Sequence, residues 1–113
     1  MHTGLDFRAE YGAPVRASGA GQVIAAEYAG GYGNMVEIDH GNGVSTRYGH
    51  LASIAVSPGE AIAAGVIVGR AGSTGRSTGP HLHYETRIDG EPVDPQRFLR
   101  AGARLEMLRQ AAR

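Results

Sequence analysis

The sequence contains no cysteine and no lysine. Without thiolates, disulfide bonds and Cys-ligated metal sites are excluded, so any bound metal must be held by His, Asp or Glu. Without lysine, a nucleotide site of the P-loop type is excluded, although residues 72–79 form a glycine-rich segment. These two absences leave histidine and carboxylate chemistry as the main candidates.

An excess charge and a long apolar run are also missing. Eleven basic residues balance eleven acidic residues, so no net charge favours nucleic acid or an anionic membrane as a partner. No apolar run approaches the roughly 20 residues that cross a bilayer, and no signal peptide is recognisable at the start of the sequence. We therefore expect no nucleic-acid partner and no membrane segment in this chain.

Turn-forming residues, in contrast, are abundant. The 113 residues include 18 Gly and 5 Pro, which supply the tight turns that connect short strands. Hydrophobic residues make up 42% and charged residues 19%, as is typical of globular proteins. A chain of this length fits one compact domain. The composition predicts a mainly β domain.

One hairpin is clearly marked in the sequence. Residues 35–40 alternate between two faces, and Asn42-Gly43 favours the positive backbone angles of a type I′ turn. The partner strand is expected at residues 44–51, with Tyr48 and His50 on a common face.

Other segments complete the expected secondary structure. Further strands are predicted at residues 22–28, 61–71 (one or two strands, split near Gly65) and 81–88. The tail differs, because Asp94-Pro95 is typical of a helix start, and residues 104–112 are expected to be helical.

The pair His81 and His83 is the first candidate site. Alternate residues of a strand share a face and lie about 6.6 Å apart along it, so both imidazoles point the same way, with Glu85 next in line. Such a pair can place both rings, or one ring and a helper, at a single metal ion. The alternative is two half-exposed polar residues on a solvent-facing surface.

Two more segments contain histidines that could join this site. His2 and Asp6 lie on a short turn or strand start, from which an imidazole and a carboxylate can bind zinc from two directions. The alternative is a frayed terminus. His50 could be a structural histidine, and His40 is interpreted as a hairpin residue without chemistry.

Together, these residues match a catalytic zinc site, which keeps one position open for water. Imidazoles outside the ligand set could transfer a proton and stabilise an oxyanion. The residues alone do not decide which histidines are ligands. A serine nucleophile is disfavoured because no Gly-x-Ser-x-Gly elbow is present.

Three segments resemble, in order, the signature motifs of lysostaphin/LytM-type peptidases. They are HTGLDF (residues 2–7), YGHL (48–51) and GPHLHYE (79–85). Connecting segments also resemble the family: GAPV (12–15), GN (33–34), HGNG (40–43) and PVDP (92–95). The resemblance extends from residue 2 to about residue 99, which makes residues 1–99 a metallopeptidase domain and residues 100–113 a helical tail.

The resemblance implies a small antiparallel β domain with an open groove and a short C-terminal helix. It implies one zinc ion held by His2, Asp6 and His83. It assigns His50 and His81 as the catalytic pair that activates the water and stabilises the tetrahedral intermediate.

The resemblance also implies a function: an endopeptidase that cuts peptide bonds in bacterial peptidoglycan stems or cross-bridges. Separately, we expect the chain to be a monomer. The parent protein would then act in the periplasm, in the cell envelope or as a secreted enzyme. Family domains carry a strand before the first histidine, so we expect this sequence to be truncated there, with weakened metal and substrate binding.

Two alternatives to an active enzyme remain at this stage. Some relatives have lost the metal ligands and activate cell-wall amidases, so the main rival is a zinc-free or inactive module that recognises peptidoglycan and acts through a partner. A purely structural zinc is the other alternative. It is disfavoured because structural sites usually fill all four positions with Cys or His.

Overall fold

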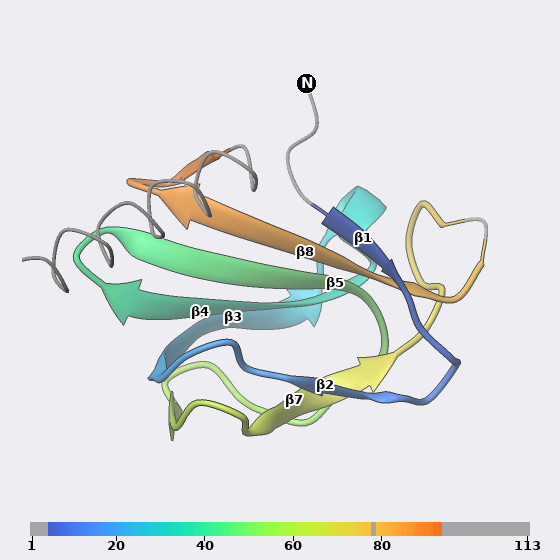
Figure 1. Ribbon diagram of the computed structural model, residues 1–113, viewed down its shortest axis with the longest axis horizontal. Helices are drawn as coiled ribbons and strands as arrows, with labels where there is room; N and C mark the ends of the chain where they lie inside the picture. The colour runs from blue at the N-terminus through green and yellow to red at the C-terminus, as the bar shows by residue number, and fades with distance from the viewer. Residues whose placement is uncertain (1–4, 78, 94–113) are drawn as a thin grey trace, which may run out of the picture.

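The computed structural model describes residues 5–77 and 79–93, which form one antiparallel sheet (Figure 1). The strands are β1 (Leu5–Arg8), β2 (Pro14–Arg16), β3 (Gly21–Tyr28), β4 (Asn34–Gly41), β5 (Val44–Ile54), β6 (Ala61–Ile62), β7 (Ile67–Ala71), β8 (His81–Ile88) and β9 (Glu91–Pro92). The predicted mainly β, antiparallel fold is therefore confirmed. The predicted C-terminal helix and the division at residue 99 lie outside the described residues.

Helical structure is minimal in the described part of the chain. It consists of the 3-10 turn η1 (Gly30–Tyr32), which connects β3 to β4. Among the described residues, no helix is long and apolar enough to cross a membrane.

The β4–β5 hairpin forms where the sequence predicts it. Gly41 pairs with Val44, and Asn42 and Gly43 between them have φ values of 55° and 77°. Positive φ at both central positions is the mark of a type I′ turn, which Asn-Gly favours. Strand β3 pairs with the other edge of β4, so three consecutive strands lie side by side.

Strand β5 belongs to two parts of the sheet. From Val44 to Gly49 it pairs with β8, and from Leu51 to Ile54 it pairs with β7. The change of partner falls at His50, whose φ of 61° lies in the left-handed region that non-glycine residues rarely adopt. Figure 1 shows β7 and its partner β2 below the layer that contains β3, β4, β5 and β8.

The hydrophobic core lies between these two layers. The largest fully buried apolar side chains are Val23, Val36, Ile38, Tyr48, Leu51 and Val68. The buried Tyr48 hydroxyl accepts a hydrogen bond from the Ser18 backbone N–H at 3.0 Å. Leu82 and Tyr84 of β8 pack against this core, so the residues that alternate with them lie on the opposite face of the sheet, called the outer face below.

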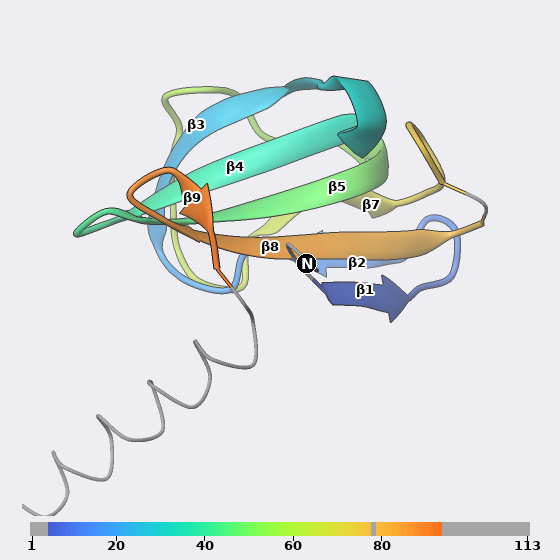
Figure 2. The ribbon, with the colours of Figure 1, turned by 90° about the horizontal axis from the view of Figure 1, so that it is seen from above.

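Short strands pair with both ends of β8. At its start, β1 runs antiparallel beside it, and at its end β9 does so. Figure 2 shows β1 alongside β8 in the view from above. In this register Asp6 lies opposite His83, although 77 positions separate them in the sequence. The β1–β8 pairing therefore brings two of the predicted site residues together.

Candidate functional site

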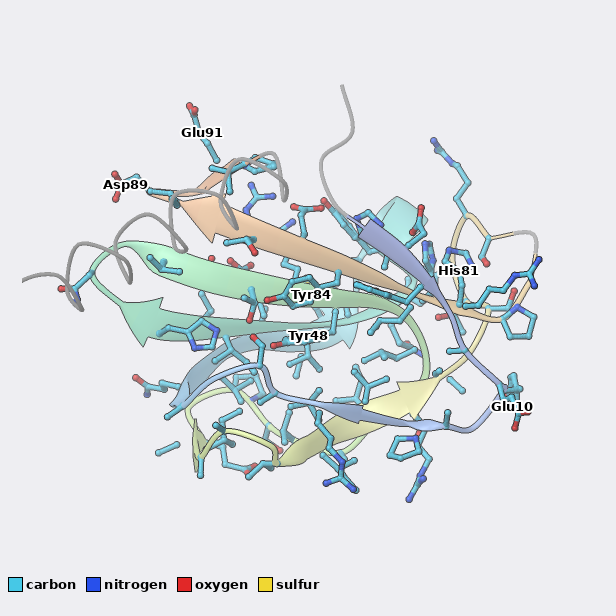
Figure 3. The ribbon with its side chains drawn as sticks, viewed as in Figure 1. Glu10, Tyr48, His81, Tyr84, Asp89 and Glu91 are labelled. Atoms are coloured by element: carbon cyan, nitrogen blue, oxygen red, sulfur yellow. The ribbon has the colours of Figure 1, made fainter. Side chains whose placement is uncertain are left out.

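His81 and His83 lie on the outer face of β8. Tyr84, which alternates with them, faces the core and packs against Tyr48 with ring centroids 5.5 Å apart. Figure 3 shows His81 where β1 passes β8, and Tyr84 near Tyr48. The shared face of the two imidazoles, expected from strand alternation, is therefore present.

Asp6 approaches both imidazoles from β1. Its Oδ1 atom lies 2.9 Å from His83 Nδ1 and 3.5 Å from His81 Nε2. Residues directly opposite each other on antiparallel strands carry their side chains on the same face, which explains the approach of Asp6 to His83. The carboxylate is largely exposed, with 63% of its side chain accessible to solvent.

His50 is the third imidazole of the cluster. Its ring centroid lies 4.7 Å from that of His81 and 6.0 Å from that of His83. The expectation that His50 shares a face with Tyr48 is wrong, because Tyr48 faces the core whereas His50 contacts the outward-facing histidines. The left-handed backbone at His50 accounts for the difference, since strict alternation holds only along a regular strand.

Backbone carbonyls orient His50 and His81 in the same way. His50 Nδ1 lies 2.7 Å from the Thr74 carbonyl oxygen, and His81 Nδ1 lies 2.8 Å from the Gly79 carbonyl oxygen. A carbonyl can only accept a hydrogen bond, so each Nδ1 must carry the proton. In the neutral form of each ring, Nε2 is then unprotonated and can accept a proton.

His83 is held between two carboxylates. Its Nδ1 faces Asp6, while its Nε2 lies 3.1 Å from Glu85 Oε2. The hydrogen bond to Glu85 raises the pKa of His83 above its ordinary value, burial opposes this shift, and Asp6 adds to it. With Nε2–H donated to Glu85, Nδ1 is the atom that His83 can offer to a metal.

Glu85 is fully buried and links several side chains on the outer face. The Tyr32 hydroxyl donates to Glu85 Oε2 at 2.8 Å, and the Arg87 guanidinium donates to Oε1. Burial alone would raise the pKa of Glu85, but the hydrogen bonds from His83, Tyr32 and Arg87 leave it below its ordinary value. Glu85 is therefore an ionised hydrogen-bond acceptor for His83.

The donor set fits zinc as far as the structure describes it. Asp6 and His83 offer a carboxylate oxygen and an imidazole nitrogen, both of which zinc accepts. Within residues 5–77 and 79–93, no group of three His, Asp or Glu side chains has the geometry of a metal site. The predicted third ligand, His2, lies outside the described residues.

A pocket of about 460 Å³ lies beside these imidazoles. It is lined by Gly31, Tyr32, His50, Arg76 and His83. The pocket is therefore bordered by η1, by the bend in β5 and by the loop before β8, and it opens beside the candidate site.

Sequence reasoning missed the roles of three residues near this pocket: Tyr32, Thr74 and Glu85. Glu85 had a signal, because it continues the alternation of His81 and His83 along β8. The sequence held no signal for Tyr32 or for the Thr74 carbonyl, because their contacts join segments that are far apart in the sequence. His40, interpreted as inert, hydrogen-bonds to the Ala20 carbonyl and to Thr46 Oγ1 instead of joining the cluster.

Comparison with known sequences gives a family match. Residues 1–95 match the sequence model of Peptidase family M23. The DD-carboxypeptidase/endopeptidase Mpg of Neisseria meningitidis is 53% identical over 95 residues, which are 84% of this chain and 22% of Mpg. The chain thus spans about a fifth of the length of this curated relative.

Two solved structures are similar to the fold described above. The catalytic domain of the antimicrobial peptidase lysostaphin from Staphylococcus simulans has a TM-score of 0.82 and 36% identity, covering 88% of this chain and 80% of that domain. A zinc-containing peptidase from Vibrio cholerae has a TM-score of 0.79 and 43% identity, covering 82% of this chain and 29% of that one. The lysostaphin-type resemblance is confirmed: this chain belongs to peptidase family M23.

Proposed function

We propose that this chain is a zinc-dependent endopeptidase that hydrolyses peptide bonds in bacterial peptidoglycan. The observation that carries the proposal is the meeting of Asp6 and His83 across two paired strands, with His81 and His50 beside them. A carboxylate–imidazole pair with two further imidazoles matches the needs of metal-assisted hydrolysis. Family membership and the likeness to lysostaphin support the same reaction class.

We assign one zinc ion to His2, Asp6 and His83. Bound there, zinc would supply Lewis acidity toward a peptide carbonyl and lower the pKa of water. Glu85 supports this assignment, because it holds the Nε2 proton of His83 and leaves Nδ1 facing Asp6. Carboxylates commonly orient metal-bound histidines in this way.

His50 and His81 take the proton-transfer roles. Their Nδ1 protons are fixed on backbone carbonyls, so each Nε2 can accept a proton from the attacking water. Once protonated, either imidazole can donate to the developing oxyanion or to the leaving amine. In this assignment neither His50 nor His81 is a zinc ligand.

Replacing Glu85 with Gln is expected to weaken zinc binding about 10- to 100-fold, the range typical of groups that orient metal ligands. The neutral amide oxygen accepts the His83 proton less strongly, and when it takes the place of Oε2 the amide NH2 group faces Arg87, which is itself a donor. Competition with a chromophoric chelator measures the zinc affinity.

Glu37→Gln is the matched control for Glu85→Gln. Glu37 is also buried and accepts hydrogen bonds from Arg47 and Ser45, but it does not contact a histidine. If both variants lose zinc affinity equally, Glu85 has no specific role in orienting His83.

The family supports a substrate class and a location for the parent protein. Mpg is named as a DD-carboxypeptidase/endopeptidase, which supports cleavage between D-residues of peptidoglycan stems. Peptidoglycan lies outside the cytoplasmic membrane, so we place the parent protein in the periplasm, in the cell envelope or outside the cell. The open pocket beside His50 and His83 is large enough to admit part of a peptide.

Digestion of purified peptidoglycan tests this function. We expect the zinc-loaded chain to release fragments with new amino termini, which mass spectrometry identifies. Treatment with a chelator should abolish their release, and added zinc should restore it. Peptidoglycan binding without cleavage at full zinc occupancy would instead indicate the rival function, a binding module.

A further inference from the structure

Arg76 is a cation on the wall of the pocket, next to two imidazoles of the candidate site. It lines the pocket together with His50 and His83. No ion pair joins Arg76 to a carboxylate within the described residues. Its guanidinium therefore keeps its hydrogen-bonding capacity for a molecule that enters the pocket.

Two arginines near the pocket, Arg47 and Arg87, differ from Arg76. Arg47, whose guanidinium lies 5.3 Å from the centre of the Tyr32 ring, forms an ion pair with Glu37 at 2.8 Å. Arg87 forms an ion pair with the fully buried Glu85. Both are neutralised by carboxylates of the protein, so neither offers a free charge to a substrate.

The backbone around Arg76 is held in place. Its N–H donates to the Gly31 carbonyl at 2.9 Å, which ties the loop before β8 to η1. A Cβ atom placed on Gly31 would lie 3.8 Å from Arg76 Cβ and about 4.0 Å from its guanidinium, so the arginine side chain lies along the glycine backbone. The positive charge is therefore directed along one wall of the pocket.

We infer that Arg76 binds a free carboxylate of the substrate peptide and makes this enzyme prefer acidic peptides over amidated ones. The inference rests on the proposed function, since it concerns the same pocket. A planar guanidinium binds carboxylates through paired, charge-assisted hydrogen bonds. Because His50 and His83 share the pocket, the carboxylate would lie within a few residues of the cleaved bond.

Two sources of carboxylate have the same chemistry: the carboxyl terminus of the peptide and an acidic side chain. Two pairs of synthetic peptides distinguish them. In one pair the terminal carboxylate is replaced by a carboxamide, and in the other the side-chain carboxylate is replaced. Each peptide carries an N-methylated amide at the cleavage position, so that calorimetry measures binding without turnover.

We expect the wild-type chain to bind one acidic peptide about tenfold more tightly than its amidated partner, the effect of one partly exposed charge-assisted interaction. The pair that shows this difference identifies the source of the carboxylate. In Arg76→Gln the ratio of dissociation constants should fall to about one. In Arg76→Lys, which keeps the charge without the planar fork, it should be intermediate.

Arg16→Gln is the control for net charge, because Arg16 is exposed on β2 and bonded to the Gly65 carbonyl, outside the pocket. It should keep the tenfold ratio. A ratio of one in the wild-type chain, an unchanged ratio in Arg76→Gln, or no binding of any peptide would overturn the inference. Cleavage of the unmethylated peptides is scored separately, so loss of the proposed function is distinguished from loss of the Arg76 preference.

Discussion

The His83→Ala variant should lose most of its bound zinc and, with it, nearly all hydrolysis of peptidoglycan peptides. Removal of the imidazole deletes one of the three proposed protein ligands and leaves Asp6 without its nearest partner, 2.9 Å away. Elemental analysis of purified protein measures the zinc content, and mass spectrometry of digested peptidoglycan measures cleavage. Circular dichroism shows whether the variant is still folded.

His40→Ala is the matched control for His83→Ala, because it also removes one imidazole. His40 bonds to the Ala20 carbonyl and to Thr46, away from the cluster. This variant should retain about one zinc ion per chain. Full zinc content in folded His83→Ala would show that the ligand assignment is wrong.

His50→Ala and His81→Ala should give the opposite result: zinc retained and turnover lost. In the proposed mechanism each ring supplies an oriented Nε2 for proton transfer, a role that typically contributes about 10²–10⁴ in rate. We expect kcat to fall by this factor in each variant, with the zinc content close to that of the wild-type chain. Because the two rings lie 4.7 Å apart and act on one reaction, the double variant should lose less than the product of the two single effects.

Zinc loss in His81→Ala would contradict this division of roles. His81 Nε2 lies 3.5 Å from Asp6 Oδ1, so the geometry makes His81 the natural competitor of His83 as a ligand. The difference between the two lies in their other ring nitrogens. His81 Nδ1 is bound to a neutral carbonyl, whereas His83 Nε2 is bound to the ionised Glu85, the kind of partner that commonly orients a metal-binding histidine.

Local patterns were sufficient to predict the central strands. The Asn42-Gly43 turn depends only on its own backbone angles, and the alternation along residues 81–88 places His81 and His83 on one face wherever the strand lies in the sheet. Short strands such as β1 and β9 lack such a pattern. They form because they pair with the free edge of β8. That edge exists only in the folded sheet, so the local sequence does not reveal these strands.

The candidate site was predictable in its residue types and only in part in its geometry. Strand alternation grouped His81 with His83, but the register that sets Asp6 opposite His83 joins residues far apart in the sequence. The position of His50 was misjudged because a left-handed, non-glycine residue inside a strand has no sequence signal. Likewise, Arg76 differs from Arg47 and Arg87 only once the structure shows that these two arginines form ion pairs with carboxylates.

Anomalous diffraction at the zinc edge from crystals of the zinc-loaded chain tests the central claim most directly. The account predicts a single zinc ion bonded to Asp6 Oδ1 and His83 Nδ1, with Glu85 on His83 Nε2 and with His50 and His81 outside the ligand set. Zinc bonded to His81 in place of His83, or the absence of zinc between β1 and β8, would contradict it.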